Sequence, residues 1–372
     1  MASISRRPDG IWRARYRDQE GREHSRHFGR KVDAQRWLDE VTAAILTGLY
    51  ADPKAGKVTF ASYYQGWSSR QVWVRSTRLS FDRAVETASF RALSIRSIRT
   101  SQIEAWVQQQ VSDGLAPSTI GVRFQQVRSV FRAAIRDRVI AVDPCIGVRL
   151  PRKRRADAAM EIPSTDQVAL LLGVRTRFRA FVALCAFAGL RRGEAAGVQV
   201  GDIDFLRRTL TVARQLQRAD DGQMVAVPPK YGSERVVYLP GSLVEMLADH
   251  VARWCPGKDP ARWLFSDSGT PWHDNRATYL WRRASSGAGI EGITLHDLRH
   301  FYASGLIAAG CDVVTVQRAL GHASATTTLN TYAHLWPSAE DRTRAAASGL
   351  MATVLGLPAD SLRTDETRLR SD

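Results

Sequence analysis

The sequence is poor in cysteine and lacks any long hydrophobic run. Its 372 residues include only four cysteines, which are widely spaced and form no paired motif: Cys145, Cys185, Cys255 and Cys311. This spacing argues against a disulfide framework and predicts free, buried thiols in a reducing cytoplasm. No segment is long and apolar enough to span a bilayer, and the sequence begins without a signal-peptide pattern. We therefore expect no membrane partner.

Acidic residues are also scarce relative to basic ones. There are 37 aspartates and glutamates against 53 lysines and arginines, which gives a formal charge of +16 and a pI near 10.3. A charge of this size predicts a polyanionic partner such as DNA. A basic membrane-surface protein is the competing interpretation, but no apolar segment supports it. The length is sufficient for two or three domains.

Six polar residues in the second half of the chain could together perform phosphoryl transfer. They are Arg191, Lys230, His296, Arg299, His322 and Tyr332. The first five can donate hydrogen bonds or protons to a phosphate, and the phenol of Tyr332 could attack one. Fixed donors aimed at the equatorial oxygens supply most of the catalysis in such reactions. Arginine suits this task because its planar fork binds two oxygens and stays protonated.

Helix signals surround the first arginine. An apolar run at 181–187 predicts a buried helix that ends at Gly189, since glycine readily adopts the left-handed turn of helix ends. The next helix is expected to begin near Arg191, with Glu194 one turn in and able to brace an arginine. Taken alone, Arg191 is more typical of a surface arginine at a helix junction.

The remaining candidates are predicted to lie in a hairpin, two helices and a loop. Lys230 lies between the strand-like runs 224–227 and 235–239, which predicts a hairpin tip from which a mobile lysine could protonate a leaving alkoxide. Thr294 caps a helix on which His296 and Arg299 share a face. His322 follows a helix at 312–320, and Tyr332 lies in a helix that begins at Ser324. Taken singly, these residues are more typical of a solvated lysine, a turn histidine and a half-buried tyrosine.

A zinc site is a further interpretation of the histidines. His296 and His300 are four residues apart, as on a metalloprotease helix, and His322 could add a ligand. Asp297 follows the first histidine, however, and is one methylene shorter than the glutamate base of such enzymes. Arg299 would also bring positive charge toward the metal. The sequence therefore predicts no metal and no cofactor.

The joint order of these segments resembles the catalytic signature of the tyrosine recombinase family, the phage integrases and their relatives. The resemblance covers about half of the chain and rests on five stretches: Gly189-Leu190-Arg191-Arg192-Gly193-Glu194, the Lys230 segment, His296-Asp297-Leu298-Arg299-His300, Leu320-Gly321-His322-Ala323-Ser324, and Thr327-Thr328 with Tyr332. Gly193 stands where serine is frequent, and Ala188 where threonine is frequent. Neither departure falls on a catalytic position.

The resemblance implies a site-specific DNA recombinase, most like an integrase of a phage or mobile element. Tyr332 would attack a DNA phosphate and form a 3′-phosphotyrosine, and strand exchange would pass through a Holliday junction on a homotetramer. Arg191 and Arg299 would hold the nonbridging oxygens, His296 and His322 would assist, Lys230 would protonate the leaving oxygen, and Glu194 and His300 would support them. A type IB topoisomerase and a non-catalytic DNA-binding regulator are the alternatives.

The resemblance also implies partners and a location. Double-stranded DNA would be bound at core and arm attachment sites, and a host DNA-bending protein or directionality factor would assist. The protein would be cytoplasmic and associated with a bacterial nucleoid.

We predict a mainly α fold with small β-sheets, in which residues 1–57 form a β-ribbon plus helix. Alternation places Trp12, Ala14 and Tyr16 on one face, and the basic residues Arg13, Arg15 and Arg17 on the other. Such a ribbon can enter the DNA major groove, and it resembles the arm-type DNA-binding domain of phage integrases. A merely solvated face is the alternative.

Residues 58–150 predict a helical domain, which resembles the core-binding (SAM-like) domain. A helix at about 118–138 presents three arginines at four-residue spacing: Arg128, Arg132 and Arg136. A linker at 151–160 follows, with Arg152, Lys153, Arg154 and Arg155 placed to track DNA; a nuclear address is the alternative. An α+β catalytic domain at 161–350 would contain a small antiparallel sheet between Ile203 and Leu239. The tail at 351–372 is expected to be disordered from Asp360, and the apolar segment 345–357 could pack on a neighbouring protomer.

Overall fold

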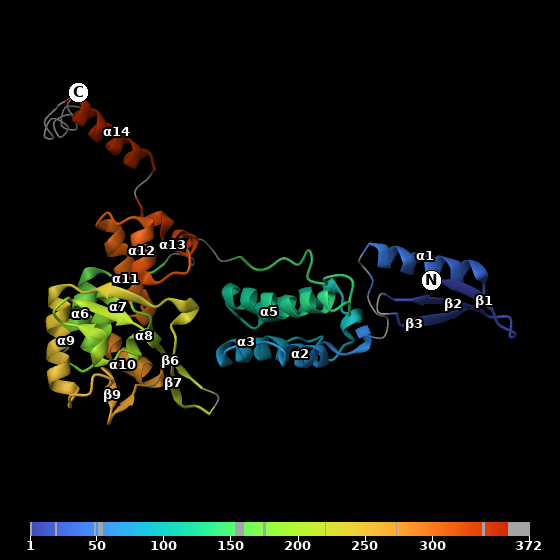
Figure 1. The fold of residues 1–372 in the computed structure, drawn as a ribbon, viewed down its shortest axis with the longest axis horizontal. Coiled ribbons are helices and arrows are strands. Elements are labelled where there is room, and N and C mark those ends of the chain that lie inside the picture. The colour runs from blue at the N-terminus through green and yellow to red at the C-terminus, as the bar shows by residue number, and fades with distance from the viewer. Residues whose placement is uncertain are drawn as a thin grey trace. The chain divides into compact units, whose positions relative to one another are not determined.

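The computed structural model describes residues 2–18, 21–47, 50, 55–152, 160–173, 176–219, 221–272, 274–336 and 339–355. Contacts divide the chain into two compact units, Met1–Ala159 and Met160–Asp372. Helices predominate in both, with small antiparallel sheets, as the sequence predicts (Figure 1). No helix among the described residues is long and apolar enough to cross a membrane. All four cysteines are free, and Cys145, Cys185 and Cys255 are buried.

The first unit begins with a three-stranded antiparallel sheet covered on one face by a helix (Figure 1). The elements are β1 (Ser3–Arg6), β2 (Trp12–Arg17), β3 (Glu23–Phe28) and α1 (Lys31–Leu46). Ala14 and Tyr16 of β2 are buried together with Ala34 and Leu38 of α1. The predicted two-faced strand is thus confirmed: Ala14 and Tyr16 of β2 face the core, and the arginines that alternate with them lie on the opposite face.

Four longer helices form the rest of the first unit around a second core. They are α2 (Phe60–Ser68), α3 (Arg75–Glu86), α4 (Thr100–Ser112) and α5 (Pro117–Arg136). The apolar stripe of α5 is buried at Ile120, Phe124 and Phe131 and partly buried at Ile135. A capping box with Ser101 as N-cap and Glu104 as its partner is expected, but the N-cap of α4 is Arg99, two residues earlier. The Gln102 side chain there accepts a hydrogen bond from the backbone N–H of Arg99 at 2.8 Å.

The second unit combines helices with three short antiparallel sheets. Its helices are α6 (Thr165–Gly173), α7 (Arg179–Phe187), α8 (Arg192–Ala196), α9 (Gly241–Trp254), α10 (Asp274–Gly287), α11 (Leu295–Ala308), α12 (Val313–Leu320), α13 (Ala325–Tyr332) and α14 (Ala339–Leu355). Helix α7 lies against α11 in the centre, and every residue of α7 from Ala180 to Ala186 is buried. Ser164 and Gln167 form a capping box at the start of α6.

The strand pairing differs from the predicted hairpin at Lys230. Strands β4 (Ile203–Asp204), β5 (Thr209–Val212) and β8 (Arg235–Tyr238) form one sheet, while β6 (Gln215–Arg218) pairs with β7 (Met224–Val227) in another. A further short pair joins β9 (Ser266–Asp267) to β10 (Thr270–Pro271). The strands on either side of Lys230 therefore belong to different sheets, and the prediction that they pair with each other is wrong. Lys230 lies in the segment that passes from one sheet to the other.

Candidate active site

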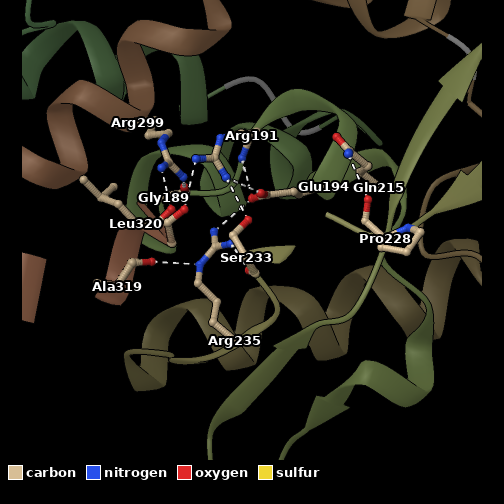
Figure 2. Close-up of polar contacts among 11 residues, drawn as sticks. Gly189, Arg191, Glu194, Gln215, Pro228, Ser233, Arg235, Arg299, Ala319 and Leu320 are labelled. Atoms are coloured by element: carbon tan, nitrogen blue, oxygen red, sulfur yellow. Dashed lines mark hydrogen bonds and ion pairs between the residues drawn. The ribbon is translucent and has the colours of Figure 1, made fainter. Parts of the chain in front are cut away.

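Arg191 lies where three separate segments of the second unit meet (Figure 2). It is the residue before α8, and its Nη1 donates to Glu194 at 2.7 Å and to the Ser233 hydroxyl at 3.3 Å. Its Nη2 donates to the carbonyl of Gly321 at 3.2 Å. The guanidinium therefore ties the start of α8 to the end of the Lys230 segment and to the turn that precedes His322.

Arg299 of α11 lies beside it and is only 1% exposed. It donates to the backbone carbonyls of Gly189 and Leu320, each at 2.5 Å. Two hydrogen bonds leave three of the five N–H groups of a guanidinium for another ligand. Burial and the charge of Arg191 lower the pKa of Arg299 to about 9, so the side chain remains a cation at neutral pH.

The turn at Gly189 brings its carbonyl to Arg299. Its φ is +62°, and a Cβ there would lie 2.4 Å from the ring of Tyr302. The end of α7 therefore requires glycine both for the left-handed backbone and for the approach of α11. This is the helix end that the sequence predicts.

The buried carboxylate of Glu194 pairs with Arg191 and with a third arginine, Arg235. Glu194 has no exposed side-chain surface, and Arg235 at the start of β8 has 7%. Arg235 Nη2 donates to Glu194 at 2.9 Å, and its Nε donates to the carbonyl of Ala319 at 3.0 Å. Burial alone would raise the pKa of Glu194, but the hydrogen bonds and charges of Arg235 and Arg191 outweigh burial and hold this pKa below its usual value.

The proposed nucleophile, Tyr332, is buried at the end of α13 with 1% exposure. Its hydroxyl lies 2.7 Å from Nδ1 of His300, and its ring is parallel to that of His322 at a centroid distance of 6.4 Å. Burial raises the pKa of Tyr332 to about 12, although the charges of Arg299 and Arg191 oppose this rise. Tyr332 therefore lies close enough to Arg299 and Arg191 for their charges to act on its phenol.

The histidines differ in their partners. Burial and the neighbouring His296 lower the pKa of His300 to about 4, which leaves a neutral ring able to accept the phenol hydrogen at Nδ1. Burial and the charges of Arg299 and Arg191 likewise lower the pKa of His322 to about 4, and Thr328 fixes its Nδ1 at 2.9 Å. His296 is exposed, and partial burial together with Arg299 lowers its pKa.

Lys230 is exposed, and its ammonium lies 5.0 Å from the centroid of the adjacent Tyr231 ring. It makes no ion pair with any of the described carboxylates. Lys230 and His296 are thus the two candidates of the six that are exposed, and Lys230 would have to move its side chain to reach a bound phosphate.

The sequence does not identify Arg235, Ser233 or Gln215 as site residues, because nothing in the local pattern marks them as buried. A turn signal was present for the β6–β7 hairpin, however, in Asp221-Gly222, where Gly222 has φ +85°. Recognising that turn would have paired 215–218 with 224–227 and separated Lys230 from the hairpin.

The residues predicted to bind DNA are spread over the first unit. Arg13 and Arg15 share the carboxylate of Glu23, at 3.6 and 3.9 Å, while Arg17 is exposed. Arg128 donates a hydrogen bond to the buried Asp143 at 2.9 Å. Exposed positions are occupied by Arg132, Arg136 and Arg152. Lys153, Arg154 and Arg155 lie outside the described residues, as does the tail from 356 onward.

No group of three or more histidine, cysteine, aspartate or glutamate side chains among the described residues is arranged to hold a metal ion. His296 and His300 do approach each other, with centroids 4.8 Å apart.

Comparison with known proteins matches both units. The phage integrase family model matches residues 163–338, and the model of the phage integrase N-terminal domain matches residues 2–47. The prophage phiRv2 integrase of Mycobacterium tuberculosis is 24% identical over 330 residues, covering 85% of this chain and 87% of the relative.

Two groups of solved structures share the fold. The Tn1549 transposon integrase in complex with a circular intermediate DNA has a TM-score of 0.68 at 20% identity, covering 78% of this chain and 99% of the other. The lambda integrase tetramer bound to a Holliday junction has a TM-score of 0.54 at 16% identity, covering 87% of this chain and 94% of the other.

Proposed function

The chain belongs to the phage integrase family, the site-specific tyrosine recombinases of phages and mobile elements, and we propose that Tyr332 is its nucleophile. One observation carries this assignment: the Tyr332 hydroxyl bonds to a neutral histidine within the cluster formed by Arg191 and Arg299. Both arginines keep donors free for a phosphate, and both are fixed by backbone carbonyls. A nucleophile, a proton acceptor and an oxyanion site are thereby assembled in one chain.

In the proposed reaction, the Tyr332 oxygen attacks a DNA phosphorus and its proton passes to His300. The bond from phosphorus to the 5′ oxygen breaks, and that oxygen takes a proton from Lys230. The product is a 3′-phosphotyrosine and a free 5′-hydroxyl. Arg191 and Arg299 neutralise the nonbridging oxygens, and His296 and His322 donate hydrogen bonds to them. Attack by a 5′-hydroxyl from a second duplex reverses the step, so no external energy source is needed.

The covered position of Tyr332 sets a condition on this reaction. A side chain with 1% exposure cannot meet a duplex, so binding of DNA must shift α13 or uncover its end. The hydrogen bond to His300 would hold the phenol in place until then.

The rest of the chain supplies DNA contacts in this proposal. The sheet of residues 3–28 would bind arm sites through Arg13, Arg15 and Arg17, and the helices of 58–150 would bind core sites through Arg132 and Arg136. Arg152 and the following basic residues would track the backbone. Four protomers would assemble on a Holliday junction, as the lambda integrase does. A host DNA-bending protein or directionality factor would join them at the bacterial nucleoid.

A nicked suicide duplex tests the proposal. Duplexes from the DNA flanking the gene of this chain are incubated with the protein in EDTA, and protein–DNA adducts that survive denaturant are measured for the wild type and Tyr332→Phe. We expect an adduct with the wild type alone. DNA binding without any adduct would favour the non-catalytic regulator. Adducts that religate only to their own strand would favour topoisomerase-like relaxation.

A further inference from the structure

The Lys230 segment, residues 228–234 between β7 and β8, is fixed at both ends and exposed in the middle. At its start, Nε2 of Gln215 donates to the carbonyl of Pro228 at 3.0 Å, and Gln215 is only 9% exposed. At its end, the Ser233 hydroxyl accepts from Arg191 at 3.3 Å, and the Ser233 carbonyl accepts from Arg235 at 3.2 Å. Figure 2 shows Gln215 bonded to Pro228, and Ser233 beside Arg191 and Arg235.

Both anchors trace back to the same short helix. Strand β6, which contains Gln215, packs against α8 where that helix has glycines: a Cβ at Gly193 would lie 3.1 Å from the Leu216 carbonyl, and one at Gly197 would lie 3.2 Å from Cα of Gln215. The residue before α8 is Arg191, which binds Ser233. Both ends of the Lys230 segment are therefore held in place relative to Arg191, the arginine proposed to bind the phosphate.

Between the anchors, the backbone makes a tight turn. Tyr231 has φ +62° and Gly232 has φ +63°, so two successive residues adopt the left-handed conformation. No described hydrogen bond holds the Lys230 side chain. Anchors of this kind limit how far the turn can move while leaving the lysine free to swing.

We propose that Gln215 and Ser233 are positioning residues that set the reach of Lys230 toward the leaving 5′ oxygen. A general acid works only within hydrogen-bond reach of the atom that it protonates. Gln215 acts through the Pro228 carbonyl and Ser233 through Arg191, and neither is assigned contact with the DNA. The inference rests on the proposed role of Lys230 as the acid.

Two substrates that differ in one atom test this inference. In one suicide duplex the scissile phosphate has its ordinary 5′ oxygen, and in the other a bridging sulfur replaces that oxygen. The phosphorus–sulfur bond breaks to release a thiolate, which needs no proton because a thiol has a pKa of about 8.5. A defect in delivering the acid therefore disappears with sulfur, whereas a defect in binding the phosphate remains.

The main variant is Gln215→Glu, which keeps the size of the side chain and replaces the donating amide with an oxygen that repels the Pro228 carbonyl. Its matched control is Gln217→Glu on the same strand, where no hydrogen bond of the side chain is described. Lys230→Ala serves as the reference for loss of the acid. Ser233→Ala is the second variant, and Arg191 keeps Glu194 and Gly321 as partners there.

We expect Gln215→Glu and Ser233→Ala to cleave the ordinary duplex about 10- to 100-fold more slowly, below the full loss for Lys230→Ala, and to cleave the sulfur duplex within about threefold of the wild type. Gln217→Glu should match the wild type on both. Equal losses on both substrates, or no loss on the ordinary one, would overturn the positioning role. If sulfur fails to restore Lys230→Ala, the assignment of Lys230 as acid is wrong and the inference fails with it. Unfolding temperatures identify a variant that fails to fold, in which case the other anchor decides.

Discussion

Replacing Glu194 by glutamine should destabilise the second unit strongly. The carboxylate has no exposed surface and accepts three hydrogen bonds: from Arg191 N–H at 3.0 Å, from Arg191 Nη1 at 2.7 Å and from Arg235 Nη2 at 2.9 Å. A glutamine keeps one oxygen for one arginine and turns an amide N–H₂ toward the other. Removing one partner of a buried ion pair costs about 3–5 kcal/mol. We place the loss near the lower end, about 3 kcal/mol, because one acceptor remains.

Hydrogen exchange of peptides from α7 and α11 in increasing urea reports the unfolding free energy of this unit within the whole chain. Glu245→Gln on α9 is the matched control, because its side chain is exposed, and it should change the free energy by less than about 0.5 kcal/mol. A double-mutant cycle with Arg235→Met should show a coupling of about 1–3 kcal/mol. A loss below about 1 kcal/mol for Glu194→Gln would refute the view that this carboxylate organises the site.

The difference in unfolding free energy between the wild type and Glu194→Gln should depend on pH, which gives a second check. The folded-state pKa of Glu194 lies below the ordinary 4.5, so folding favours the charged form. Its contribution is present above pH 4.5 and is lost as the pH falls through the folded-state value. The difference between wild type and Glu194→Gln should therefore shrink below pH 4.5, and a difference that grows there would contradict the assignment.

Three further predictions follow from the same contacts. Gly189→Ala should lower the unfolding free energy by at least about 2 kcal/mol, because alanine is strained in the left-handed backbone and its Cβ would clash with Tyr302. Gly305→Ala, in open space on α11, should instead raise this free energy by about 0.5–1 kcal/mol. Equal effects of the two substitutions in urea unfolding would count against the tight turn. Burial lowers the pKa values of His300 and His322 to about 4, so the unfolded chain takes up protons at a higher pH than the folded chain. The unfolding free energy should therefore fall between pH 6.5 and pH 4. His322→Gln should reduce this fall in urea unfolding, and an unchanged dependence on pH would argue against a buried neutral ring. Replacing Arg13 and Arg15 with alanine should abolish integration while sparing cleavage of a core site, and equal loss in both assays would contradict a separate arm role.

The sequence predicted the helices that hold the candidate residues better than the contacts between them. His296 and Arg299 lie in one helix, and Tyr332 ends a helix whose start is marked by Ser324, so local patterns were enough to place these residues in their elements. The pattern of apolar residues likewise predicted the buried α7 and the glycine turn after it.

Contacts between distant segments could not be predicted in this way. The bond between His300 and Tyr332 spans 32 residues, and the pair of Arg235 with Glu194 spans 41. An arginine at the start of a strand has the same local pattern whether it points to solvent or into the core. Only the packing of β8 beside α12 places Arg235 between Glu194 and Ala319. The wrong hairpin at Lys230 has the same origin, because strand-like runs do not reveal their partners.

The most direct test identifies the residue to which the DNA is attached. The adduct formed in EDTA is digested with trypsin and nuclease, and the peptide that retains a nucleotide is sequenced by mass spectrometry. Cleavage after Arg318 and Arg342 gives a peptide of residues 319–342, in which Tyr332 is the only tyrosine. The account predicts a 3′-linked nucleotide on Tyr332 of that peptide. A nucleotide on any other residue, or DNA cleavage without a covalent adduct, would contradict it.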